Sequence, residues 1–298
     1  MRKFKPLKIS ILGLISLLAI SCNTPNKSII SIDYQNEMDI YWKKRRDSRE
    51  NNYLKLCGLL KLEDSISFFG YNDYLSPEIN EPMSDTIGKF LTTADSILFF
   101  PLNQHNTRTE DGKTIEKLNY PIYSNGNSEK LFFKNLYWQI ITRSNKKYVR
   151  VWHSKNPAVE HFKGYEKFPL NPDLRLKAYF KYYEEAKHEE VKSQLGLPSS
   201  QSFVGKLTFM FNENNYSLDV VTDGFLMVSD DTSGEKTYGG GRYLDLDLPE
   251  KNDSIILDFN KLYNPPCIFS DFTTCIYPPT QNYLPFQVLA GETSMAKQ

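Results

Sequence analysis

Segments in which polar and apolar side chains alternate recur along much of this 298-residue chain. Between Arg175 and Tyr182 every second residue is apolar or aromatic, which is the period of two expected of a half-buried strand. Tyr and Phe, with 19 residues each, also favour strands. We therefore expect a mainly β fold, an antiparallel β-barrel or sandwich. Further strands are predicted at residues 131–141, 147–152, 205–211, 216–221 and 254–259.

One helix is expected before the strands, packed against them. Residues 33–56 contain neither Pro nor Gly, Asp33 can cap the start, and Gly58 can end the helix, so we assign 33–60 to this element. Residues 212–215 predict a hairpin turn, because Asn tolerates the positive φ of tight turns. Residues 184–195 have local helical propensity.

The first 21 residues have the layout of a lipoprotein signal peptide. Four basic residues precede an uncharged run from Ile9 to Ser21, which is too short for the roughly 20 apolar residues of a membrane span. Small residues before Cys22 form a cleavage box, and the Cys22 thiol can then take a thioether-linked diacylglycerol. Ordinary secretion with a free Cys22 thiol is the alternative.

Lipid at Cys22 predicts a protein anchored on a membrane of the cell envelope. Several acyl chains hold a protein stably, since each buried methylene contributes about 0.8 kcal/mol. No acidic run follows Cys22, so we expect an outer-membrane protein that faces the periplasm rather than the cell surface. Residues 22–32 are expected to form a flexible tether.

The charge balance argues against nucleic acid as a partner. The chain has 36 Lys and Arg against 36 Asp and Glu, and removal of residues 1–21 takes away four basic side chains. The short basic run at 43–49 is balanced by Asp47 and Glu50 and is expected to be a solvated helix face, with contact to anionic lipid head groups as the alternative. A seam near residues 156–157 is expected to divide a first β-rich half, 61–156, from a C-terminal β-rich half, 157–298.

The most distinctive stretch runs from Asp230 to Glu292. It contains three successive glycines before Arg242, a DFNKLYNPP segment beginning at Asp258, and a Pro-rich loop. In order and spacing these motifs resemble an uncharacterised bacterial family, the domain of unknown function family 1684 (DUF1684). Residues 41–60 and 162–169 are similar to two further segments of that family, W-x(2-3)-R…G-x-L and F-x-G-L-x-x-F-P. The resemblance implies membership but no activity, because the family has none established.

Polar residues and a glycine of this stretch form a candidate pocket for a glycan or an acidic small molecule, provided that they converge. Backbone N–H groups beside Arg242 could hold a carboxylate or phosphate. The alternative is structural: a glycine bulge, Arg242 paired with an acid such as Asp258, and short polar side chains that satisfy loop backbone groups. The candidate pocket residues are Tyr238, Gly240, Arg242, Asp258, Asn260, Asn264 and Glu292.

The four cysteines and four histidines give no metal-site spacing, so neither a metal nor another cofactor is predicted. Cys267 and Cys275, eight positions apart, are expected to form a disulfide in an oxidising envelope, and a redox role for this pair is one hypothesis. Cys57 is expected to be a buried apolar thiol.

No catalytic residues can be assigned, because Gly-x-Ser-x-Gly and H-E-x-x-H motifs are missing from the sequence. The favoured hypothesis is therefore a binding module for a glycan, lipid or protein. The alternative is a hydrolase of an envelope or imported substrate, in which Arg242 and carboxylates such as Asp231, Asp258 and Glu292 do the acid and base work.

Overall fold

The computed structural model describes residues 30–71, 77–80, 86–102, 106–120, 127–194, 196 and 198–296. The predicted signal peptide, Cys22 and most of the predicted tether lie outside these ranges. Within them, no helix combines the length and the apolar character that crossing a membrane requires.

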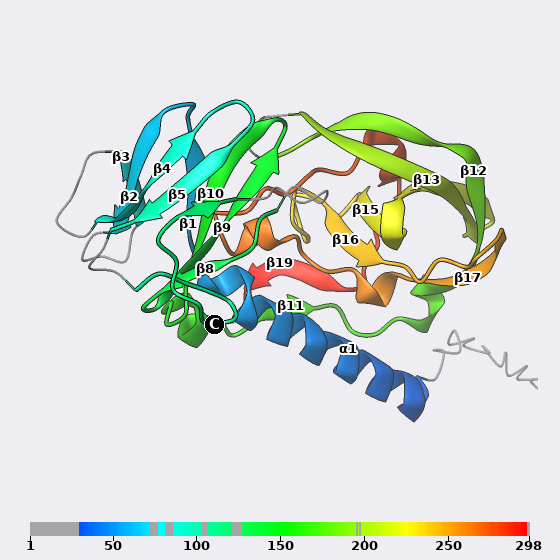
Figure 1. Cartoon of the computed structure of the whole chain (residues 1–298). Coiled ribbons are helices and arrows are strands. Elements are labelled where there is room, and N and C mark those ends of the chain that lie inside the picture. The colour runs from blue at the N-terminus through cyan, green and yellow to red at the C-terminus, as the bar shows by residue number, and fades with distance from the viewer. Residues whose placement is uncertain are drawn as a thin grey trace, which may run out of the picture.

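The described residues of the first half form two antiparallel sheets, each of five strands. They lie on the left in Figure 1. One sheet has the order β1-β10-β9-β8-β6 and the other β3-β2-β4-β5-β7. Aromatic side chains fill the space between them, and the indole ring of Trp138 packs edge-on against Phe69 and Phe99. The strands are β1 (Leu56–Leu62), β2 (Ile66–Tyr71), β3 (Pro77–Asn80), β4 (Thr86–Thr92), β5 (Ile97–Pro101), β6 (Arg108–Thr109), β7 (Leu118–Asn119), β8 (Leu131–Phe133), β9 (Leu136–Arg143) and β10 (Lys146–His153).

Three smaller sheets are formed by the part of the C-terminal half that the structure describes, with orders β14-β13-β12-β17, β16-β15-β18 and β11-β19. Its first sheet curves over the other two (Figure 1). The strands are β11 (Tyr165–Lys167), β12 (Arg175–Lys192), β13 (Pro198–Phe211), β14 (Asn214–Val221), β15 (Phe225–Asp230), β16 (Arg242–Asp245), β17 (Asp253–Asp258), β18 (Tyr283–Leu284) and β19 (Glu292–Ala296). Helices are short here: α2 (Ala158–His161), η2 (Pro172–Leu174), η3 (Thr222–Gly224), η4 (Phe259–Lys261), η5 (Pro266–Ile268) and η6 (Thr280–Asn282).

The predicted mainly β class is confirmed, and the observed arrangement is the sandwich, because the sheets of the described residues stay open. Alternation places Ala178 and Phe180 of β12 in the core and leaves their neighbours exposed. The predicted hairpin joins β13 to β14, with positive φ at Asn212 and Glu213 (47° and 63°). Buried apolar residues form one cluster between residues 62 and 151 and further clusters between 174 and 290.

The predicted helix is shorter in the structure. The helix α1 (Ile32–Asn51) runs beneath both halves beside β11 and β19 (Figure 1), and its cap is Ser31 rather than Asp33: Ser31 Oγ accepts a hydrogen bond from the backbone N–H of Tyr34 (3.2 Å). A short helix, η1 (Tyr53–Lys55), follows, and residues 56–60 belong to β1. The apolar residues after α1 gain more by pairing with β10 and entering the core than by extending the helix.

The helical propensity of residues 184–195 is also overridden. Residues 184–192 continue β12, and 187–192 pair with 198–203 of β13. Pairing with the next strand supplies a hydrogen-bond ladder and buries Val191 and Phe203 in one cluster, which the helical propensity of a single segment cannot anticipate.

Candidate functional site

Five of the seven predicted pocket residues are buried, all but Tyr238 and Gly240, and the seven do not line one cavity. Arg242 is 1% exposed, and its Nη2 donates to Asp230 Oδ2 (2.8 Å) and to the carbonyl of Val288 (2.9 Å). Its Nη1 donates to the carbonyls of Ala290 and Glu292. The acid paired with Arg242 is thus Asp230, not the suggested Asp258, and the Arg242 side chain holds the segment before β19 against β15 and β16.

The glycines before Arg242 have a packing role. Gly241 has φ +80°, and a Cβ there would lie 2.8 Å from the carbonyl oxygen of Val228. A Cβ at Gly240 would meet the Tyr238 ring at 2.4 Å, and the Tyr238 hydroxyl lies 3.6 Å from Cys267 Sγ. The glycines therefore allow a tight bend, as the structural alternative expected.

Asp258 and Asn260 fasten the end of β17. Both carboxylate oxygens of Asp258 accept the Tyr34 hydroxyl (2.8 and 2.9 Å), which ties the first turn of α1 to the sheet. The side-chain amide of Asn260 accepts the backbone N–H of Asn171 and donates to its carbonyl, both at 2.8 Å. Burial and the Asp258 carboxylate raise the pKa of the Tyr34 phenol, so the phenol stays protonated as a donor.

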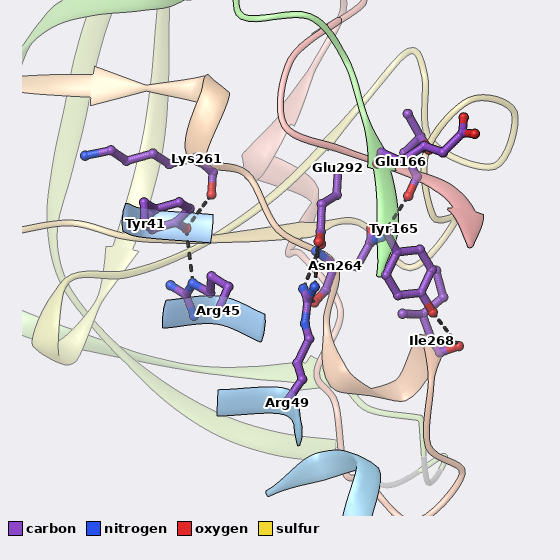
Figure 2. A network of polar contacts seen from close by, with 10 residues as sticks. Tyr41, Arg45, Arg49, Tyr165, Glu166, Lys261, Asn264, Ile268 and Glu292 are labelled. Carbon is purple, nitrogen blue, oxygen red and sulfur yellow. Dashed lines mark hydrogen bonds and ion pairs between the residues drawn. The ribbon is translucent and has the colours of Figure 1, made fainter. Parts of the chain in front are cut away.

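Glu292 and Asn264 belong to a buried ion-pair network with α1 (Figure 2). Arg49 points from the last turn of α1 and meets Glu292 through two hydrogen bonds of 2.6 and 2.7 Å. The backbone N–H of Asn264 donates to the same carboxylate (2.7 Å), and the Asn264 amide donates to the carbonyl of Thr293 (2.8 Å). Arg49 is 6% exposed, so the prediction of a solvated face is wrong for this residue.

Cys267 and Cys275 are free cysteines, so the predicted disulfide is not formed in the structure. The loop instead places Cys275 Sγ as the acceptor of the Cys267 backbone N–H (3.1 Å). A hydrogen bond from the Cys267 thiol lowers the pKa of Cys275. Cys57 packs partly buried against the first core, and burial raises its pKa to about 12.

A cavity of about 400 Å³ lies where α1, the first half and the C-terminal half meet. Of the seven predicted pocket residues, only Asn264 lines it. Arg143 and Arg150 enter from β9 and β10, and Ser199 and Gln201 from β13. The other lining residues are Arg45, Ser48, Arg49, Tyr53, Phe225, Tyr243, Tyr263, Pro266, Phe269, Thr273, Thr274, Cys275 and Ile276.

The cavity carries an excess of positive charge. Arg45 is paired with Asp245 and lies 3.5 Å above the Tyr263 ring, and Arg49 is paired with Glu292. None of the ion pairs formed among the described residues includes Arg143 or Arg150. Burial, together with the neighbouring Arg143 charge, lowers the pKa of Arg150 to about 10, and burial lowers that of Arg143. Arginine side chains keep their proton in folded proteins, so both guanidinium groups are charged at neutral pH.

Aromatic side chains form much of the remaining wall. Tyr53, the first residue of η1, packs edge-on against Phe269 with ring centroids 6.1 Å apart. Phe225 and Tyr243 form a second edge-on pair at 4.8 Å. The alternation of residues 147–152 predicted the strand that carries Arg150, but no local signal showed that its side chain faces this cavity, since the other walls come from residues far away in sequence.

Fold and site together define a mainly β, sandwich-type protein with an arginine-lined cavity between its two halves. Residues 160–293 match the model of a family described as "protein of unknown function (DUF1684)", and this part of the chain belongs to that family. The resemblance inferred from the motifs of residues 162–169 and 230–292 is thereby confirmed, whereas the segment 41–60 lies outside the match. The match takes in the C-terminal half and leaves out α1, Arg143 and Arg150.

One similar solved structure is an NMR structure of an uncharacterized protein from gene locus rrnAC0354 of Haloarcula marismortui. It is 30% identical over 45% of this chain and 78% of that chain, with a TM-score of 0.38. No curated protein matches the chain.

Proposed function

We propose that this protein is a ligand-binding module of the bacterial cell envelope, and that its ligand occupies the arginine-lined cavity. The observation that carries this proposal is the presence of two partly buried guanidinium groups, Arg143 and Arg150, that have no ion-pair partner among the described residues and face a cavity of about 400 Å³. Small-molecule sites span roughly 300–1,000 Å³ and combine apolar walls with a few polar groups. A glycan end or another small molecule fits that description better than a protein surface does.

Anchoring is the second part of the proposal. The basic start, the uncharged run and the small residues before Cys22 support cleavage and lipid attachment there. The protein would then act on the outer membrane, facing the periplasm, with the membrane as a partner through its acyl chains.

The hydrolase alternative has no comparable support. Its proposed groups are engaged elsewhere: Asp258 accepts the Tyr34 hydroxyl, Glu292 is paired with Arg49, and Arg242 is paired with Asp230. None of the three lines the cavity.

Thermal unfolding of the full chain, purified in detergent, tests the binding proposal. A panel of neutral sugars, organic anions and organic amines is expected to contain at least one class that raises Tm, because a ligand that binds only the folded state stabilises it. Thr274→Trp, which places an indole in the cavity, is expected to abolish that shift.

Thr208→Trp is the matched control, because Thr208 is exposed on β13 and does not line the cavity. It should keep the wild-type response. A wild-type chain that no member of the panel stabilises, or a Thr274→Trp variant that responds as the wild type does, would contradict the proposal.

A further inference from the structure

We infer that the ligand of this cavity is an organic anion, with a carboxylate or phosphate group held between Arg143 and Arg150 and a ring-bearing body against the aromatic wall. This inference rests on the proposed function and names the chemistry that the site selects.

The charge of the cavity favours an anionic ligand. Two of its four arginines are already neutralised, Arg45 by Asp245 and Arg49 by Glu292. Arg143 and Arg150 repel each other in a partly desolvated place, which is unfavourable without a counter-charge. An anion bound between them removes that repulsion, whereas a neutral ligand leaves it in place.

Arg143 and Arg150 also have N–H donors left over for a ligand. A guanidinium group has five N–H donors. Arg150 uses Nη2 toward Thr274 Oγ1 (3.3 Å), and its buried Nε has no hydrogen-bond partner. Arg143 uses Nη1 toward the carbonyl of Thr142 (2.7 Å). The remaining donors match the planar, two-oxygen recognition that arginine gives to carboxylates and phosphates.

The size and the aromatic walls of the cavity favour a ligand larger than a lone anion. A lone phosphate or carboxylate fills only a small part of about 400 Å³. Tyr53 and Phe269, which line the same cavity, offer ring surfaces to the rest of a ligand. The anion is therefore expected to be one end of a larger molecule with a planar or ring-shaped part.

Calorimetric titration of the full chain in detergent with four probes tests this inference. Phenyl phosphate and benzoate carry the two anionic groups on a ring, inorganic phosphate lacks the ring, and benzyl alcohol lacks the charge. At least one of the first two is expected to bind, inorganic phosphate at least about tenfold more weakly, and benzyl alcohol not measurably. Which ring-bearing anion binds more tightly separates a phosphate ligand from a carboxylate ligand.

Arginine variants show where the anion sits. Arg143→Gln and Arg150→Gln are each expected to weaken the better-binding anion about tenfold or more, as expected when a hydrogen bond to a charged group is lost. The Tm of ligand-free Arg150→Gln should not fall, because the substitution removes an unpaired charge. Lys146→Gln removes an exposed charge opposite Arg143 on the same hairpin, outside the cavity, and should leave the affinity within about twofold.

The outcomes separate the two proposals. If benzyl alcohol or a neutral sugar binds, Thr274→Trp abolishes that binding, and both arginine variants leave it intact, the anion inference is wrong while the proposed function stands. The anion inference is also wrong if phenyl phosphate binds equally well to the arginine variants. If neither these probes nor the wider panel bind the wild-type chain, both proposals fail.

Discussion

At the scale of single residues, the polar side chains of the C-terminal half act mainly in folding. Glu292 is 2% exposed and receives three hydrogen bonds, two from Arg49 and one from the Asn264 backbone. A buried charge pair is weak evidence for net stability, but removing one partner leaves the other uncompensated.

Glu292→Gln is therefore expected to lower the free energy of unfolding by about 3–5 kcal/mol, since it keeps the shape of the side chain and removes only the charge. Urea denaturation measures the loss. Asp47→Asn breaks the exposed pair with Lys43 and should change stability by less than about 1 kcal/mol. Equal losses in the two variants would show that the Arg49–Glu292 pair does not fasten α1.

The same side chains show why the arginine-lined cavity could not be found from the sequence. Arg242, Asp258 and Asn260 are polar residues in a distinctive pattern, and that pattern turned out to serve backbone carbonyls, a helix and a loop. Arg143 and Arg150 have no such pattern around them. They stand out because they line a cavity without an ion-pair partner among the described residues. Only the folded chain shows this.

At the scale of elements, strands were predictable and the ends of elements were not. Alternation is a local property, so it identified β12 and the hairpin between β13 and β14. The end of α1 depends on the pairing of β1 with β10, which lies far along the chain, and the extension of β12 depends on its hairpin pairing with β13. Local propensity therefore placed helix in both segments where the structure has strand.

The loop of residues 267–275 is expected to make Cys275 more reactive than Cys57. Cys275 lines the cavity, and its pKa is lowered chiefly by the Cys267 thiol, whereas burial raises the pKa of Cys57 to about 12. Because the thiolate is the reactive form, iodoacetamide at pH 8 should modify Cys275 well before Cys57. Mass spectrometry of tryptic peptides assigns each site, and earlier labelling of Cys57 would contradict this arrangement of the loop.

At the level of the whole molecule, the cavity is lined by residues inside the family match and by residues that precede it. The family match spans 160–293, while α1, Arg143 and Arg150 lie before it. The cavity thus forms where α1 and the first β half pack against the region, residues 160–293, that matches the family. Ligand binding should therefore stabilise both halves together.

The proposed lipid anchor at Cys22 determines where the whole molecule acts. Cells grown with labelled palmitate are expected to incorporate label into the wild-type protein and none into Cys22→Ala, with the wild type in the membrane fraction. Unlabelled wild-type protein, recovered uncleaved from the cytosol, would rule out the proposed location without affecting the cavity.

Anion binding between Arg143 and Arg150 is the property on which the proposed ligand chemistry depends. A crystal structure of the full chain soaked with phenyl phosphate tests it most directly. We predict phosphate oxygens within hydrogen-bond distance of both guanidinium groups, with the phenyl ring beside Tyr53 and Phe269. Density for the ligand elsewhere on the protein, with an empty space between the two arginines, would show that this cavity is not the anion site.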